Sequence, residues 1–262
     1  MIHLKNKSEI EKLYRAGQIV KDTLFYIEDF IKPGVSTIEL DRLAEEYIRS
    51  KKAIPGFKGL YDYPATLCIS IDDEVVHGIP SKRVLEKGQI VGIDVGSIYD
   101  DFYGDHAKTF VVDETTPDKM KLLEVTKECL LLGIDQARVG NRIGDIGYAI
   151  QNHAESNGYS VVRELIGHGI GRKLHEEPQV PNFGLSGKGP LIEDGLCLAI
   201  EPMINMGDYN VYVKDDNWTY CTSDGKPSAH FEHSIAVYDN KVKILTVWKY
   251  GKRKTNRSWW RD

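Results

Sequence analysis

The sequence predicts an α+β fold made of two similar halves that form a single domain over residues 1–262. Segments with apolar residues at helical spacing precede strand-rich segments, and the order of two helices followed by a sheet occurs twice. Short motifs that contain a carboxylate or a histidine also recur in the same order in both halves. We expect the halves, about 8–113 and 116–248, to bring curved sheets together, with helices outside and a site in the central cleft.

The first half begins with two predicted helices. Ser8 and Glu11 have the spacing of a capping box, and Pro33-Gly34 would end the first helix. The apolar residues between them alternate by three and four; they are Ile10, Leu13, Gly17, Val20, Leu24, Ile27 and Ile31. Ser36 and Glu39 predict the start of a second helix. Its inner face would carry Leu40, Leu43, Tyr47 and Ile48, and residues 54–112 should then be rich in strands.

The second half repeats this order. Thr116 followed by Pro117 predicts the start of a long helix, because proline is favoured at the first helical position. Its inner face would carry Met120, Leu123, Leu130, Ile134 and Ala137. Gly140 and Asp145 predict a further helix that ends near Asn157, and strands should follow over residues 159–247.

Composition excludes several functional classes. The chain is 41% hydrophobic and 28% charged, as is ordinary for a globular protein, and its net charge of −5 argues against DNA binding. Residues 1–7 lack the apolar core of a signal peptide, and no apolar run is long enough to span a membrane. The cysteines form no C-x-x-C motif, which favours a reducing compartment. We therefore predict a cytoplasmic protein. The four cysteines are Cys68, Cys129, Cys197 and Cys221.

Two aspartates stand at the centre of the first half. Asp94 closes an apolar run that is typical of a buried strand, and Asp105 opens a second one. The Gly- and Asp-rich segment between them predicts a hairpin. Carboxylates that point into an apolar interior need a positive partner, and no lysine or arginine occupies these positions. A bound metal cation would satisfy them; the alternative is a solvated turn with surface aspartates.

The duplication supplies further ligands. Residues 88–94 match residues 195–201, so that Asp94 corresponds to Glu201; Asp105 corresponds to Glu232 and His77 to His168. The candidate ligands are Asp94, Asp105, His168, Glu201 and Glu232. Four carboxylates balance two divalent cations, which can hold a reactive water between them. Oxygen-rich ligation without thiolate suits manganese, cobalt, iron or magnesium, and the sequence does not distinguish these metals.

Seven motifs, taken in order, closely resemble those of type I methionine aminopeptidase. They are residues 76–80 (VHGIP), 92–96 (GIDVG), 104–106 (GDH), 167–171 (GHGIG), 175–178 (HEEP), 200–203 (IEPM) and 231–233 (FEH). The resemblance extends from Ser8 to about Leu245. It implies the pseudo-twofold "pita-bread" fold and removal of the initiator methionine from nascent polypeptides when the second residue is small.

The resemblance also implies a role for each residue. The five candidate ligands would hold a dinuclear centre, with Asp105 and Glu232 bridging and Glu201 helping to deprotonate the attacking water. His175 would contact the scissile carbonyl oxygen, and His77 would assist proton transfer near the substrate amine. The methionine pocket would be lined by Tyr63, Cys68, Leu174 and Trp218. For Cys68 and Trp218, ordinary packing is the alternative.

The chain departs from the family at three positions. Leu174 stands where phenylalanine is common, Leu60 where a pocket tyrosine is common, and His230 where glutamine is common. The first two changes concern the shape of the pocket rather than the metal centre. The sequence offers no account of His230.

Two other functions are compatible with such a fold. A prolyl peptidase of the aminopeptidase P kind would keep the metal site but would usually carry an extra N-terminal domain, for which Asp94 comes too early. A non-catalytic peptide-binding relative would typically have lost ligands. We also predict a monomer. The basic tail 249–262, with Trp259 and Trp260, is either a frayed end or a ribosome contact.

Overall fold

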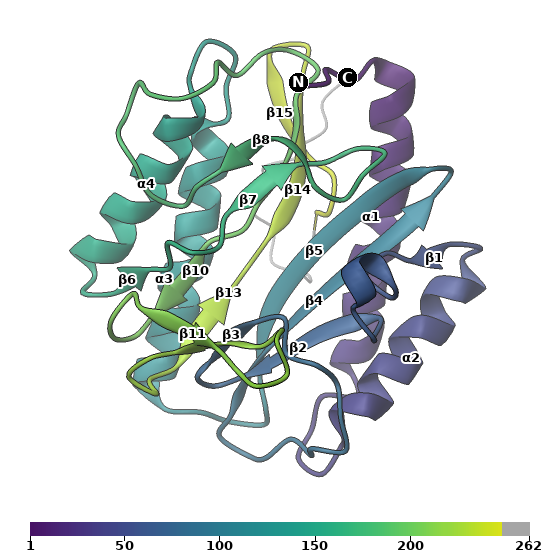
Figure 1. The fold of residues 1–262 in the computed structure, drawn as a ribbon, viewed down its shortest axis with the longest axis vertical. Coiled ribbons are helices and arrows are strands. Elements are labelled where there is room, and N and C mark those ends of the chain that lie inside the picture. The colour runs from purple at the N-terminus through teal and green to yellow at the C-terminus, as the bar shows by residue number, and fades with distance from the viewer. Residues whose placement is uncertain (248–262) are drawn as a thin grey trace, which may run out of the picture.

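The fold places two layers of helices around curved antiparallel sheets, as the sequence predicted. A computed structural model describes residues 1–247, so the tail 249–262 lies outside the described residues. Figure 1 shows α1 and α2 beside the strands of the first half, and α3 and α4 beside those of the second. Within the described residues, no helix is long and apolar enough to cross a membrane.

Helix α1 (Lys7–Glu28) covers the first-half sheet with its apolar face. Six of the seven predicted apolar positions, Ile10 to Ile27, are buried, whereas Ile31 lies beyond the end of the helix. The predicted capping box was wrong by two residues. Asn6 is the N-cap: its side chain accepts a hydrogen bond from the Glu9 amide at 3.1 Å, and the Glu9 carboxylate accepts one from the Asn6 amide. The helix also ends five residues before Pro33.

Helix α2 (Thr37–Ser50) begins after Ser36, as predicted, although the Ser36 side chain makes no capping hydrogen bond. The core beneath α1 and α2 includes Val20, Leu24, Leu40 and Ile48 from the helices and Val91, Ile93 and Val95 from the sheet. This packing buries one face of the strand that carries Asp94. The burial of apolar side chains therefore fixes the position of a candidate ligand.

Helices α3 (Pro117–Gln136) and α4 (Ile143–Ser156) cover the second half and pack against one another. The predicted start of α3 is confirmed, because the Thr116 side chain accepts a hydrogen bond from the Lys119 amide. One predicted core residue was wrong: Met120 is 50% exposed. The buried face of α3 is instead formed by Leu122, Leu123, Val125, Thr126, Cys129, Leu130, Gly133 and Ile134.

The strands form four sheets with antiparallel pairing throughout. The first contains β1 (Ile54–Pro55), β2 (Leu67–Ile71), β4 (Ile90–Tyr99) and β5 (Phe102–Val111), and a 3-10 turn, Leu60–Asp62, follows β1. The largest has the order β15 (Lys241–Ile244), β14 (His233–Tyr238), β9 (Cys197–Ile200), β7 (Gly167–Gly169) and β8 (Glu176–Val180). The third joins β13 (Ser228–His230), β10 (Met203–Asn205) and β6 (Ser160–Val161), and the fourth joins β11 (Val211–Val213), β12 (Tyr220–Thr222) and β3 (Glu74–Val76).

The two halves are joined across these sheets. Strand β3 of the first half pairs with β12 of the second, with Val76 opposite Tyr220. Strand β5 is linked to β14, because the Ser234 hydroxyl donates to the Asp105 carbonyl at 2.7 Å. Candidate residues from opposite ends of the sequence are thereby brought to one seam.

Candidate metal centre and substrate pocket

All eleven predicted site residues line one cavity of about 320 Å³ at this seam. They are Tyr63, Cys68, His77, Asp94, Asp105, His168, Leu174, His175, Glu201, Trp218 and Glu232. They come from both halves of the chain and from strands and loops on either side of the seam. The structure therefore brings together every residue that the sequence analysis selected.

Asp94 and Asp105 lie on the neighbouring strands β4 and β5. Asp105 is opposite Gly96, two residues from Asp94, so both side chains are on the same face of the hairpin. The sequence placed them at the ends of two shorter runs, and that detail was wrong. The strands continue to Tyr99 and from Phe102, and the turn is only Asp100-Asp101, where both residues have positive φ. Both candidate ligands thus occupy mid-strand positions on a rigid hairpin.

Glu232 completes a tight cluster of carboxylates. Ligand oxygens of Asp94, Asp105 and Glu232 all lie within 4.8 Å of one another. The backbone of Glu232 is tied to β5, because its amide donates to the Ala107 carbonyl at 3.0 Å and its carbonyl is bonded to His106 Nδ1 at 2.5 Å. The local backbone therefore holds three mutually repelling groups together.

His168 and Glu201 extend this cluster. His168 Nε2 lies 3.6 Å from Oδ2 of Asp105 and 3.5 Å from Oε1 of Glu201. His168 Nδ1 lies 2.9 Å from the Gly169 carbonyl oxygen, which can only accept a hydrogen bond. Nδ1 therefore carries a proton, and Nε2 faces the carboxylates. A histidine that ligates a metal has this arrangement.

The chemistry of this cluster fits divalent cations. Buried oxygens of Asp94, Asp105 and Glu232 have no hydrogen-bond partner among the described residues. No lysine or arginine of residues 1–247 lines the cavity to neutralise them. Buried carboxylates without a positive partner are costly, and oxygen and imidazole ligands are those that manganese, cobalt and iron accept.

The pKa values of these carboxylates are raised by burial and by their mutual repulsion. Burial raises the pKa of Asp94 well above its usual range, and the charge of Asp105 raises it further. Burial and the same aspartate raise the pKa of Glu232. Burial also raises the pKa of Glu201 to about 8, although His168 opposes this change. The carboxylates therefore need a compensating positive charge in order to ionise together.

His77 and His175 line the same cavity as the carboxylate cluster. His77 has a φ of 60°, which a residue with a side chain rarely adopts. The adjoining Gly78 holds this conformation, because its carbonyl accepts from Ile69 N at 2.8 Å and from the Tyr63 hydroxyl at 3.0 Å. The His175 ring is perpendicular to that of His168, with centroids 4.5 Å apart.

Comparison with known proteins agrees with this geometry. The model of metallopeptidase family M24 matches residues 11–239. The chain belongs to metallopeptidase family M24. It is 49% identical to a methionine aminopeptidase of Clostridium perfringens over 95% of this chain and 100% of that protein. A methionine aminopeptidase structure from Rickettsia prowazekii covers 94% of the chain with a TM-score of 0.93 at 40% identity, and 100% of that chain is covered.

The M24 fold is shared with enzymes of other specificity. A prolidase from Pyrococcus horikoshii superposes on 93% of this chain and 63% of its own with a TM-score of 0.75, at 21% identity. That likeness concerns the fold alone. The pita-bread architecture predicted from the sequence is thus confirmed for this M24 chain.

An apolar pocket adjoins the carboxylates of this M24 chain. Tyr63, Cys68 and Leu174 are buried, whereas Trp218 is half-buried. The Trp218 ring packs edge-on against Tyr63, with centroids 5.0 Å apart. Cys68 lies opposite Asp94 on β2, which places the pocket directly beside the candidate ligands. Trp218 therefore packs against Tyr63 and also lines the cavity.

Sequence reasoning missed several lining residues. Phe57, Val76, Leu165, Ile166 and Met203 line the same cavity and make it more apolar. Val76 and Met203 belong to the motifs at 76–80 and 200–203, and Ile166 directly precedes the motif at 167–171, so a position in or beside a motif was the available signal. His230 lies next to the centre: its Nε2 is 3.7 Å from Oε2 of Glu201 and has no hydrogen-bond partner among residues 1–247.

Proposed function

We propose that the chain is a cytoplasmic metal-dependent aminopeptidase that removes the N-terminal methionine from new polypeptides, preferentially when the second residue is small. The observation that carries this proposal is the single cavity in which a cluster of unpaired carboxylates adjoins an apolar slot. The identity to methionine aminopeptidases over nearly the whole chain supports the same substrate. An unbranched thioether side chain suits such a slot, because it adapts to irregular apolar surfaces.

In this proposal Asp94, Asp105, His168, Glu201 and Glu232 would hold two divalent ions. What supports a pair of ions is the charge balance with four carboxylates. Bound ions of this kind lower the pKa of a water molecule and polarise a peptide carbonyl. Cobalt, manganese and iron all suit the donor set.

Three side chains around the ions would transfer protons and stabilise the charge that develops on the substrate. The carboxylate of Glu201, kept ionised by the bound cations, would accept a proton from the attacking water. His175 donates a hydrogen bond to the scissile carbonyl oxygen as negative charge develops there. His77 would assist proton transfer near the departing amine by accepting a proton there and passing it to the leaving nitrogen. Burial and the charge of the nearby His175 together lower the pKa of His77 to about 4, so His77 is neutral before reaction.

The methionine side chain would lie between Tyr63 and Trp218, with Cys68 and Leu174 at the walls of the slot. The buried Tyr63 hydroxyl donates to the Leu67 and Gly78 carbonyls, at 2.9 and 3.0 Å. The tyrosine therefore presents only its ring to the slot. This arrangement favours an apolar side chain over a charged one, because a charged group would lose its hydration without gaining a partner.

A side-by-side assay of Met-Ala and Ala-Pro peptides tests this function. Protein stripped with a chelator is supplied separately with manganese, cobalt or iron, and the released amino acid is measured. We expect methionine release from Met-Ala with at least one metal and no cleavage of Ala-Pro. Cleavage of Ala-Pro would instead assign a prolyl peptidase. No turnover with any of the metals would favour a non-catalytic binding protein.

Two narrower expectations belong to the same proposal. We propose that the enzyme is a monomer and that residues 249–262 contact the ribosome. The support for the second is the six basic residues and two tryptophans of that segment, which is outside the described residues.

A further inference from the structure

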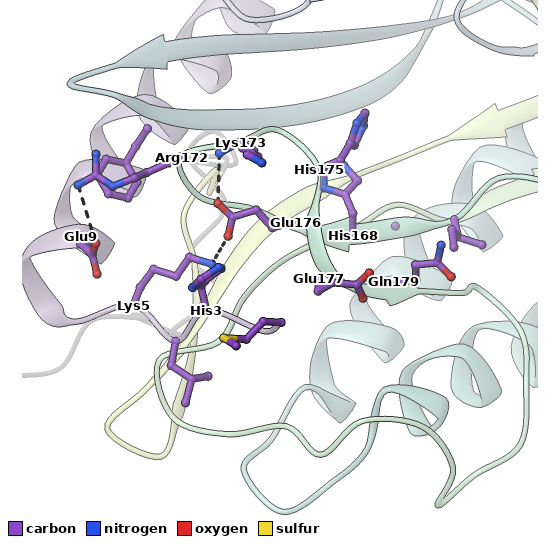
Figure 2. Close-up of a pocket in the computed structure, with 15 residues that line it drawn as sticks. His3, Lys5, Glu9, His168, Arg172, Lys173, His175, Glu176, Glu177 and Gln179 are labelled. Atoms are coloured by element: carbon purple, nitrogen blue, oxygen red, sulfur yellow. Dashed lines mark hydrogen bonds and ion pairs between the residues drawn. The ribbon is translucent and has the colours of Figure 1, made fainter. Parts of the chain in front are cut away.

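A buried ion pair links the start of the chain to the segment that carries His175. Lys5 Nζ lies 2.6 Å from Oε2 of Glu176, and the exposed fractions of the two side chains are only 5% and 10%. Figure 2 shows this pair at the wall of a second hollow, of about 770 Å³, which also exposes His168 and His175. Because 171 residues separate the partners, the contact exists only in the folded chain.

Glu176 also organises the turn that precedes it. Its other carboxylate oxygen, Oε1, accepts a hydrogen bond from the Lys173 amide at 3.1 Å. The Gly171 amide in turn donates to the Lys173 carbonyl at 3.1 Å. A Cβ on Gly171 would collide with the Glu176 carboxylate, so the turn closes directly around this group. The turn 171–175 therefore closes around the Glu176 carboxylate. His175 is the residue directly before Glu176 in the chain.

Lys5 is itself held in place by the large sheet. Its amide donates to the Gly195 carbonyl at 2.7 Å, and the Gly195 amide donates to the Val237 carbonyl of β14 at 2.7 Å. The ammonium group therefore approaches Glu176 from a fixed position rather than from a mobile surface chain. A charged hydrogen bond of this kind in a water-poor site defines geometry more firmly than an exposed pair does.

We propose that Lys5 and Glu176 are positioning residues of the active site: their ion pair fixes the turn 171–175 and thereby orients the His175 ring toward the substrate carbonyl. This inference rests on the proposed function for its consequence in catalysis. Loss of the pair should lower kcat, because His175 would act mainly in the transition state. It should change KM little, because the methionine slot lies on other elements.

The test compares three variants of the full chain. The double variant Lys5→Met/Glu176→Gln removes both charges, so that neither is left buried alone. The single variant Lys5→Arg keeps a cation opposite Glu176. Arg172→Gln is the matched control: Arg172 is on the same turn, but its contacts with Glu9 and Asp101 are at 4.0 Å and its side chain is 57% exposed. Methionine release from Met-Ala-Ser and manganese affinity by calorimetry are measured for each.

We expect the double variant to lose about tenfold or more in kcat while KM and manganese affinity stay within about twofold. Lys5→Arg should keep most of the wild-type kcat, and Arg172→Gln should have the same kcat as the wild type. An unchanged kcat in the folded double variant would overturn the proposal. A parallel loss of manganese affinity would also overturn it, since the pair would then act on the metal centre.

A second readout is independent of activity. Long-range proton–nitrogen spectra of histidine-labelled protein report each imidazole, and His175→Asn assigns the signal of His175. We expect the His175 signal to shift or broaden in Glu176→Gln and in the double variant, while the His77 signal is unchanged. An unmoved His175 signal, or failure of both variants to fold, would overturn the positioning role. If the wild type released no methionine, the proposed function would fail, yet this spectrum would still test the pair.

Discussion

His168 Nε2 lies 3.6 Å from Oδ2 of Asp105, although the two residues belong to opposite halves of the chain. Asp105 is on the hairpin that packs beneath α1, and His168 is on a strand of the second-half sheet. The contact is not stabilised by any lysine or arginine of residues 1–247 that lines the cavity. A cation bound here would therefore hold the two halves together as well as supply chemistry.

The first prediction concerns stability. Removal of divalent metal should lower the melting temperature, because the unpaired carboxylates then repel one another across the seam. Restored manganese at about 100 times its Kd should return about 2.7 kcal/mol of unfolding free energy. Differential scanning calorimetry with and without chelator measures the effect, with magnesium-free buffer as the control. Identical melting temperatures in both states would contradict a metal that binds the folded chain.

The second prediction concerns Glu201. Glu201→Gln keeps the size of the side chain but removes the carboxylate that would accept the proton of the water. We expect a folded protein that loses about 10²- to 10⁴-fold in kcat at saturating metal. Circular dichroism and metal content are measured on the same sample, so that a loss of metal is separated from a loss of the base. A kcat equal to that of the wild type would refute the assigned role.

The third prediction concerns the methionine slot. Trp218→Ala should raise KM for Met-Ala and lower kcat/KM by about 10- to 100-fold, because one wall of the slot is lost. Tyr212→Ala is a matched control, since Tyr212 is an aromatic residue on the preceding strand β11 and is 49% exposed. If Trp218 served packing alone, its variant would melt earlier with KM unchanged.

The fourth prediction is a pH dependence of stability. Burial alone would raise the pKa of Glu176, but its hydrogen bonds to Lys5 and to the Lys173 amide outweigh burial and lower it below the ordinary value of 4.5. The ionised carboxylate therefore stabilises the fold above that value, and this contribution is lost as the pH falls through the folded-state pKa. The stability advantage of the wild type over Lys5→Met/Glu176→Gln should shrink between about pH 6 and about pH 3. Urea titrations at each pH measure it, and an advantage independent of pH would contradict the pair.

Much of the architecture could be predicted because the chain repeats its signals. The match of Asp94 with Glu201 and of Asp105 with Glu232 placed acids at equivalent positions of two halves, and such positions meet at a pseudo-twofold seam. Local boundaries were harder. Both Asn6 with Glu9 and Ser8 with Glu11 satisfy the capping-box spacing, and only the folded helix start at Lys7 decides between them.

Other features depended on tertiary structure that no local pattern encodes. Residues 130–134 of α3 are apolar almost all round, so periodicity did not define the buried face, and Met120 was placed on it wrongly. The approach of His230 to Glu201 follows from the pairing of β10 with β13, where Met203 is opposite His230. The Lys5–Glu176 pair has no sequence signal, because its partners are joined only by the fold.

The proposed activity depends on two divalent ions held among Asp94, Asp105, His168, Glu201 and Glu232. The most direct measurement is anomalous diffraction from crystals of the protein soaked with manganese, since it locates each ion independently of activity. We expect two peaks inside the cavity, each within bonding distance of these side chains and separated by about 3.5–4 Å. Manganese bound only at other surface carboxylates, with no peak among these five residues, would contradict it.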